Sequence, residues 1–137
     1  MNTRPGVVDR PARVLIVDDE RQNRQLLEVM LEPEGYQLQT ASSGEEALAM
    51  VARQPPDLVL LDIMMPGMNG YVVAARIKGD AATRNISVIL LSALDDLNSK
   101  AHGLGAGAED FLTKPVTRAE LCELVSKHLR RRFPVPP

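Results

Sequence analysis

Aromatic rings, cysteine and basic charge are all in short supply in this 137-residue sequence. It has two Tyr, two Phe and no Trp, and its formal net charge is −2 at pH 7. A surface that stacks nucleic-acid bases needs several exposed aromatic rings, and a phosphate-binding face needs an excess of Lys and Arg. We therefore expect no nucleic-acid binding by this chain, and a core built mainly from aliphatic side chains.

Other absences bear on location. Cys122 is the single cysteine, which excludes an internal disulfide, and no Cys/His cluster suggests zinc. Apolar runs are only a handful of residues long, against the roughly 20 that span a bilayer. Residues 1–13 lack the apolar stretch of a signal peptide. We expect a cytoplasmic protein with no membrane association.

What the sequence does contain is an alternation of five apolar segments with five helical patterns. Strands are expected at residues 14–17, 36–40, 58–61, 86–91 and 111–112. The first, third and fourth are apolar almost throughout, as in parallel strands that are buried on both faces. One helix is expected at residues 21–31, and the others follow the capping residues Ser43, Asn69, Asp95 and Thr117. Glycines dilute the fourth helix, which should be short and mobile.

Five successive strand–helix units suit right-handed crossovers between parallel strands. The expected fold class is α/β, a doubly wound (βα)5 domain with a five-stranded parallel sheet. We expect an N-terminal arm at residues 1–12, the domain at 13–130 and a Pro-rich C-terminal tail at 131–137.

Polar side chains follow the expected strands at the end where an open parallel sheet binds its ligands. Asp18 and Asp19 follow the first strand, Asp62 the third, Ser92 the fourth and Lys114 the fifth. Carboxylates this close repel one another, by roughly 4 kcal/mol for a pair 4 Å apart, and one lysine cannot neutralise three of them. Mg²⁺ can, and it prefers oxygen ligands. The pattern therefore indicates phosphoryl transfer, in which catalysis is mostly positioning and charge neutralisation.

The loops that usually hold a nucleotide are missing. The sequence has no Gly-x-x-x-x-Gly-Lys-Ser/Thr loop and no Gly-x-Gly-x-x-Gly after the first strand. The phosphoryl group must therefore come from another kind of donor. A carboxylate is a possible nucleophile, because aspartyl phosphates are known covalent species. Ser92 would donate a hydrogen bond to one phosphoryl oxygen, and Lys114 would pair with another.

Four motifs lie at the ends of the expected strands: VDDE at residues 17–20, LDIMMPGMNG at 61–70, LSA at 91–93 and GAEDFLTKP at 107–115. In this order and at this spacing they resemble the receiver domain of two-component response regulators, over about residues 13–130. The resemblance implies a flavodoxin-like strand order of 2-1-3-4-5. It also implies a phosphorylation-dependent signalling switch, which catalyses only its own phosphotransfer and dephosphorylation.

The resemblance implies a metal-assisted phospho-acceptor site. Asp62 matches the residue that takes a phosphoryl group from a histidine on a partner. Asp19 matches the direct Mg²⁺ ligand, and Asp18 the acid that helps hold the ion. Met64 matches the position that offers its backbone carbonyl to the metal.

The remaining motif residues match the switch. Lys114 corresponds to the phosphate-binding lysine, and its bond to Pro115 is expected to be cis. Ser92 corresponds to the switch hydroxyl. Phe111 corresponds to the switch aromatic, which moves inward when Ser92 engages the phosphate. Because Phe has no hydroxyl, a switch at Phe111 must act by packing alone.

The implied partner is a sensor histidine kinase or a histidine phosphotransfer protein. Members of the family change the surface made by the fourth helix, fifth strand and fifth helix, through which a homodimer is possible. Two arrangements fit the sequence equally: a stand-alone receiver that acts by protein contact, and a receiver excised from a longer regulator with its own output domain.

The alternative is a magnesium-dependent phosphohydrolase that also uses an aspartyl nucleophile. Haloacid-dehalogenase-type enzymes place an acid/base Asp two residues after that nucleophile. Here the position is Met64, which cannot transfer a proton, and there is no cap domain to select a substrate. Met64 and Leu94 should flank the path of the water that removes the phosphoryl group, so we predict slow self-dephosphorylation.

Overall fold

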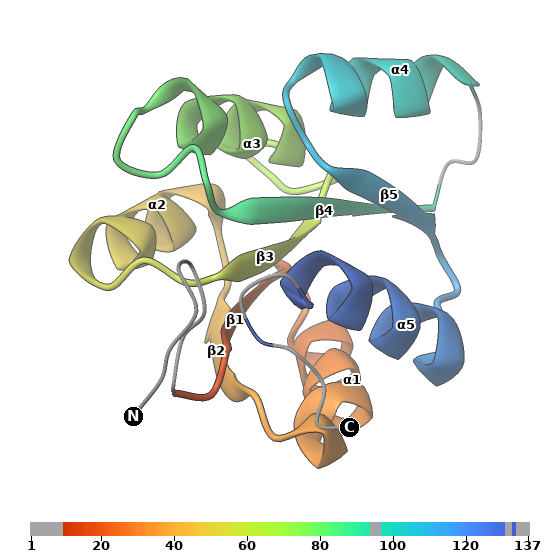
Figure 1. The fold of residues 1–137 in the computed structure, drawn as a ribbon. Helices are drawn as coiled ribbons and strands as arrows, with labels where there is room; N and C mark the ends of the chain where they lie inside the picture. Colours follow the sequence, from red (N-terminus) through yellow and green to blue (C-terminus); the bar gives the residue numbers. More distant parts are fainter. Residues whose placement is uncertain (1–9, 94–96, 131–132, 134–137) are drawn as a thin grey trace.

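The computed structural model describes residues 10–93, 97–130 and 133, with the backbone alone at 97–100 (Figure 1). The strands are β1 (Arg13–Val17), β2 (Gln37–Ala41), β3 (Leu58–Asp62), β4 (Ser87–Ser92) and β5 (Asp110–Thr113). The helices are α1 (Arg21–Leu31), α2 (Gly44–Arg53), α3 (Gly70–Gly79), α4 (Leu97–Gly105) and α5 (Arg118–Leu129), with a short 3-10 helix η1 (Glu32–Glu34) after α1.

All five strands are parallel and lie in the order β2-β1-β3-β4-β5. Helices α1 and α5 cover one face of the sheet, and α2, α3 and α4 lie on the other (Figure 1). The predicted doubly wound fold and the strand order implied by the family resemblance are both confirmed. Because every crossover returns to the same end of the sheet, the carboxyl ends of β1, β3, β4 and β5 share one edge.

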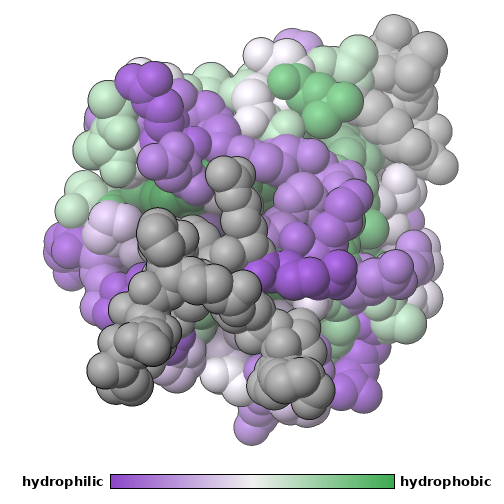
Figure 2. Space-filling view, in the orientation of Figure 1, coloured by the Kyte–Doolittle hydropathy of each residue, from purple (hydrophilic) through white to green (hydrophobic). Residues whose placement is uncertain are grey.

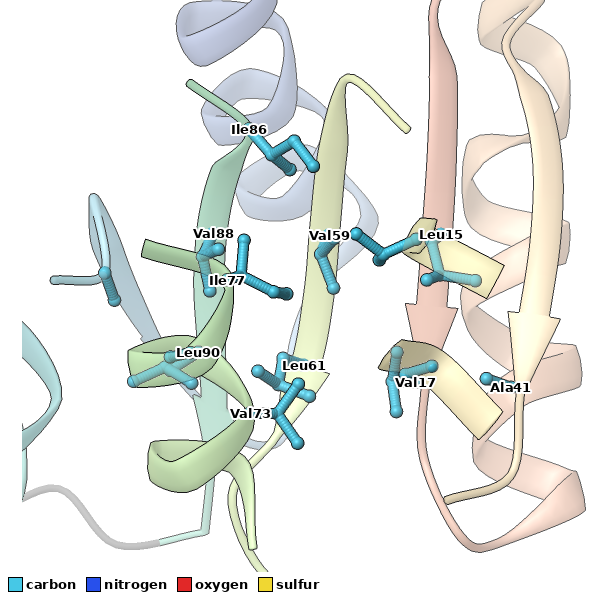
Figure 3. Packing of buried hydrophobic residues seen from close by; sticks show 14 of the residues in the cluster. Leu15, Val17, Ala41, Val59, Leu61, Val73, Ile77, Ile86, Val88 and Leu90 are labelled. Carbon is cyan, nitrogen blue, oxygen red and sulfur yellow. The ribbon is translucent and has the colours of Figure 1, made fainter. Parts of the chain in front are cut away.

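The core explains why the central strands are apolar without alternation. The register aligns Leu15 with Val59 and Val59 with Val88, so that their side chains form a row beneath α2 and α3 (Figure 3). The side chains between them on the strands, such as Ile16 and Leu60, point instead toward α1 and α5. Each such fully buried side chain contributes about 1.5–3 kcal/mol.

Hydrogen bonds to helix caps set where the helices begin. The Ser43 hydroxyl accepts from the Glu46 N–H (3.1 Å), the Asn69 side chain from the Val72 N–H (3.1 Å), and the Thr117 hydroxyl from the Glu120 N–H (3.2 Å). These three predicted caps are confirmed. The fourth, Asp95, lies outside the described residues, and α4 is nine residues long.

Strand boundaries differ from the predicted ones by one or two residues. β2 begins at Gln37 because its N–H donates to the Ala12 carbonyl (2.9 Å) just before β1. β3 and β4 each extend by one polar residue, Asp62 and Ser92, because the parallel ladder continues to the edge of the sheet. The hydrophobic pattern ends before the backbone pairing does, so apolar runs alone could not locate these ends.

Residues near both ends of the described chain contact the domain. The Arg10 guanidinium pairs with the buried carboxylate of Asp57 (2.8 and 3.2 Å) and lies 5.6 Å from the centre of the Phe133 ring. The Arg13 N–H also donates to Asp57 (2.8 Å). Ala12 is buried, and Phe133 packs against the α1–α5 side of the core. The division into arm, domain and tail stays a prediction.

Hydrophilic residues dominate the surface over α5 (Figure 2). Within the described part of the chain, no helix combines the length and the apolar character needed to cross a membrane.

Candidate functional site

Three acidic side chains meet at the carboxyl edge of the sheet. Asp62 is the last residue of β3, and Asp18 and Asp19 directly follow β1. One carboxylate oxygen from each of the three lies within 4.8 Å of the others. Asp18 and Asp62 are buried, with 0 % and 5 % of their surface exposed, whereas Asp19 is exposed. The cluster is therefore open to solvent on the side of Asp19.

One ammonium group serves this cluster. Lys114, directly after β5, places its Nζ 3.1 Å from Asp62 Oδ1 and 3.3 Å from Asp18 Oδ2. Its backbone N–H donates to the Ser92 carbonyl (2.7 Å), which ties the end of β5 to the end of β4. The Lys114–Pro115 peptide bond is cis. The predicted convergence of the three acids, Ser92 and Lys114 at one edge is thus observed.

The charges at the site are imperfectly balanced. Burial raises the pKa of the Asp62 carboxyl; Lys114 acts to lower it, Asp18 and Asp19 act to raise it, and the result is a raised pKa. Burial acts to lower the pKa of the Lys114 ammonium, but attraction to Asp62 and Asp18 outweighs it, and that pKa is also raised. Among the described residues, the three carboxylates face the single ammonium group of Lys114, which leaves an excess of negative charge that a further cation would offset. Carboxylate oxygens are the donors that Mg²⁺ prefers, so the residues fit that ion.

Backbone hydrogen bonds shape the turn between β1 and α1. The Asp18 N–H donates to the Ala41 carbonyl (3.2 Å), and Asp18 Oδ1 accepts from the Glu20 N–H (2.9 Å). The Arg24 guanidinium, from the fourth residue of α1, donates to the Asp18 carbonyl (2.8 Å). Arg24 was not among the residues that the sequence singled out, because an arginine within a helix carries no motif of its own.

The loop after β3 is held tightly against the site. The Gly70 N–H donates to the Ile63 carbonyl (2.9 Å). A Cβ at Gly70 would lie 2.5 Å from the Asp62 carbonyl oxygen and 2.8 Å from Ile63 Cα. Only glycine fits at this approach of α3 to the end of β3. Met64 lies within the loop with 65 % of its surface exposed, and its side chain has no group that transfers protons.

The two predicted switch residues lie on neighbouring strands. Ser92, at the end of β4, is 1 % exposed. Phe111, on β5, is half-buried and packs against the α2–α3 side of the core. Their roles in switching, like those of the metal-binding residues, stay predictions. Leu94, predicted to flank the water path with Met64, lies outside the described residues.

A groove of about 430 Å³ adjoins the site. Asp18 and Lys114 line its end at the acidic cluster. The other lining residues are mostly apolar and come from α1, the end of β4 and the loop after β5: Asn23, Leu26, Leu27, Met30, Leu91, Ala93, Pro115 and Val116. Leu26 is 54 % exposed. The site thus opens beside an apolar surface rather than into a deep pocket.

Comparison with known proteins finds similarity over most of the chain. The family model of the response regulator receiver domain matches residues 14–126. Response regulator PleD of Caulobacter vibrioides is 51 % identical over 105 residues, which cover 77 % of this chain and 23 % of PleD. Protein PilH of Pseudomonas aeruginosa is 39 % identical over 115 residues, which cover 84 % of this chain and 95 % of PilH.

Several solved structures have the same fold as this chain. Chemotaxis protein CheY4 of Vibrio cholerae superposes with a TM-score of 0.83 at 28 % identity, covering 88 % of this chain and all (100 %) of CheY4. The receiver domain of Francisella response regulator 1452 has a TM-score of 0.81 at 32 % identity, covering 88 % and 98 % of the two chains. The chain spans about a quarter of PleD and 53 % of the regulatory protein PhoB of Pseudomonas aeruginosa.

Proposed function

The chain belongs to the receiver domain family of two-component response regulators, and from this premise we propose that Asp62 accepts a phosphoryl group from a phosphohistidine of a partner protein. A receiver of this family is a signalling switch. The observation that carries the proposal is the meeting of Asp62 with Asp18, Asp19 and Lys114 at one edge of the sheet.

The proposed transfer exchanges one bond to phosphorus for another. An Asp62 carboxylate oxygen attacks the phosphorus atom, and a P–O bond forms as the P–N bond of the phosphohistidine breaks. The electron pair of the broken bond stays on the imidazole nitrogen, which leaves as neutral imidazole when the other ring nitrogen carries a proton. The buried position of Asp62 at the end of a paired strand fixes the direction of attack.

Lys114 and Ser92 would bind the transferred group. Lys114 Nζ already lies 3.1 Å from Asp62 Oδ1, so it is placed to pair with a phosphoryl oxygen bound to that carboxylate. Ser92 lies at the same edge of the sheet, at the end of β4, and its hydroxyl would donate to another phosphoryl oxygen. Inward movement of Phe111 upon that contact would alter the surface of α4, β5 and α5.

Asp18, Asp19, Asp62 and the backbone carbonyl of Met64 would hold Mg²⁺. When bound, the ion supplies the positive charge that offsets the phosphoryl oxygens and the three carboxylates. The pKa of Asp62 is raised first by burial and further by the nearby carboxylates of Asp18 and Asp19, and a bound cation would offset both costs of ionising the carboxyl.

The apolar groove beside Lys114 supports a protein as the donor. Leu26 and Met30 of α1 and Val116 after β5 offer a surface against which a kinase or phosphotransfer protein could bury apolar area while presenting its histidine. The output is a separate proposal, which the contacts at the phospho-acceptor site do not support or oppose. It is a further domain, a protein partner or a homodimer through α4, β5 and α5.

Intact mass spectrometry tests the proposal. The protein is incubated with acetyl phosphate, with and without Mg²⁺, beside Asp62→Asn and the control Asp80→Asn, which alters an exposed Asp after α3. We expect one added phosphoryl group in the wild type and Asp80→Asn, dependent on Mg²⁺ and absent from Asp62→Asn. An adduct on Asp62→Asn equal to that of the wild type would overturn the assignment.

A further inference from the structure

Asp19 is the one acid of the three-carboxylate cluster whose side chain is exposed. Because little packing surrounds this side chain, its position depends on the backbone that carries it. It stands in the turn between β1 and α1. Helix α1 begins at Arg21 after Glu20, which makes no side-chain capping hydrogen bond, and its first turn holds no acidic residue. The usual means of fixing the start of a helix are therefore missing at the place where the proposed metal ligand lies.

Two hydrogen bonds restrain the peptide groups on either side of Asp19. The group that precedes it carries the Asp18 carbonyl, which accepts from Arg24 Nη1 (2.8 Å). The group that follows it carries the Glu20 N–H, which donates to Asp18 Oδ1 (2.9 Å). Asp18 is itself fixed by the bond from its N–H to the Ala41 carbonyl. With both flanking peptide planes held, the Cα–Cβ direction of Asp19 is restrained.

We propose that Arg24 is a positioning residue of the metal site, which fixes Asp19 for Mg²⁺ by holding the Asp18 carbonyl from α1. The proposal rests on the proposed function and deepens it. Arg24 does not touch the reacting atoms. Its partly buried hydrogen bond joins the end of the first helical turn to the loop that carries the acids, in place of an N-terminal cap. Mutation of a residue that orients the metal ligands without binding the metal itself commonly weakens metal binding by about 10- to 100-fold.

A competing explanation is charge alone, since any cation near three carboxylates affects a metal site. Arg21 separates the two effects. It lies on the first turn of the same helix and is exposed, so Arg21→Met removes the same charge without removing the bond to Asp18. Arg24→Lys retains the charge and a donor on a long stem.

The test measures Mg²⁺ binding by calorimetric titration, without a phosphodonor, together with amide hydrogen exchange of residues 19 and 20 in the metal-free protein. For Arg24→Met we expect about tenfold weaker binding or more, and faster exchange at both amides. Arg21→Met should stay within about twofold of the wild type, as a screened surface charge would, and Arg24→Lys should lie between the two. At saturating Mg²⁺ the phosphorylation rate of Arg24→Met should recover. If Arg24→Met does not fold, Arg24→Gln, whose side chain is too short to reach, is measured instead.

The outcomes distinguish this inference from the proposed function. Wild-type affinity and wild-type exchange in Arg24→Met overturn the inference and leave the proposed function intact. An equal loss in Arg21→Met also overturns it, in favour of charge. A wild-type protein that binds no Mg²⁺ overturns the proposed function, and the inference with it. Weak binding confined to the Arg24 variants, with rescue by Mg²⁺, supports both.

Discussion

Replacing Asp62 by Asn should stabilise the metal-free protein, although it removes a buried residue with an ion pair. Oxygens of Asp62, Asp18 and Asp19 lie within 4.8 Å of one another. At an effective dielectric constant of 20, each repulsion at that distance is roughly 3–4 kcal/mol, and the attraction to Lys114 at 3.1 Å is roughly 5 kcal/mol. Two repulsions exceed one attraction, and exposure of Asp19 reduces the difference.

We therefore expect a gain of about 1–2 kcal/mol in the free energy of unfolding, or roughly 4–8 °C in the melting temperature. Lys114 keeps its partner Asp18 (3.3 Å) in the variant, so no buried charge is left alone. The sign agrees with the raised pKa of Asp62, whose first cause is burial. A raised pKa means that the folded state disfavours the ionised carboxylate. The advantage of the variant should accordingly appear above the usual aspartate range and vanish as the pH falls through the raised pKa.

The assay is urea unfolding followed by circular dichroism, in excess chelator, from acid to neutral pH. Asp57→Asn is the matched contrast, because Asp57 is a buried aspartate that pairs with the cation Arg10 and accepts from the Arg13 N–H. It should destabilise the protein. Added Mg²⁺ should stabilise the wild type more than Asp62→Asn. An Asp62→Asn protein that is less stable than the wild type without metal would refute the reasoning that the three carboxylates strain the site.

Three further changes test other parts of the account. Gly70→Ala should cost roughly 3 kcal/mol of stability, because its Cβ would meet the Asp62 and Ile63 backbone, whereas Gly79→Ala, with open space around it, should be neutral or slightly stabilising in chemical denaturation. Arg10→Met should cost about 1–2 kcal/mol in the same assay, because it leaves the buried Asp57 carboxylate with less compensation. Met64→Asn should shorten the lifetime of the phosphoryl adduct several-fold, timed by intact mass after removal of the donor; an unchanged lifetime would argue against water exclusion by this side chain.

Much of the fold follows from local sequence. The apolar runs of β1, β3 and β4 are typical of strands buried on both faces in a parallel sheet, and such a sheet brings the residues after each strand to one edge. The caps at Ser43, Asn69 and Thr117 were predictable because they depend on hydrogen bonds between residues three positions apart.

The contacts that escaped prediction join residues far apart in sequence or lack a motif. Arg10 pairs with Asp57 across 47 positions, and no pattern in the Pro-containing N-terminal segment predicts that Arg10 contacts a buried carboxylate. The need for glycine at position 70 arises from the approach of α3 to the end of β3, which depends on the tertiary packing. The bond from Arg24 to Asp18 spans only six positions, but it depends on the angle at which α1 leaves the turn.

The central claim is that Asp62 carries the phosphoryl group. Sodium borohydride reduces an aspartyl phosphate to homoserine, so treatment of the protein after incubation with acetyl phosphate and Mg²⁺, followed by peptide mass mapping, reads out the modified position directly. The account predicts homoserine at position 62 alone, and none when Mg²⁺ is withheld. Homoserine at position 18 or 19, with Asp62 intact, would contradict it.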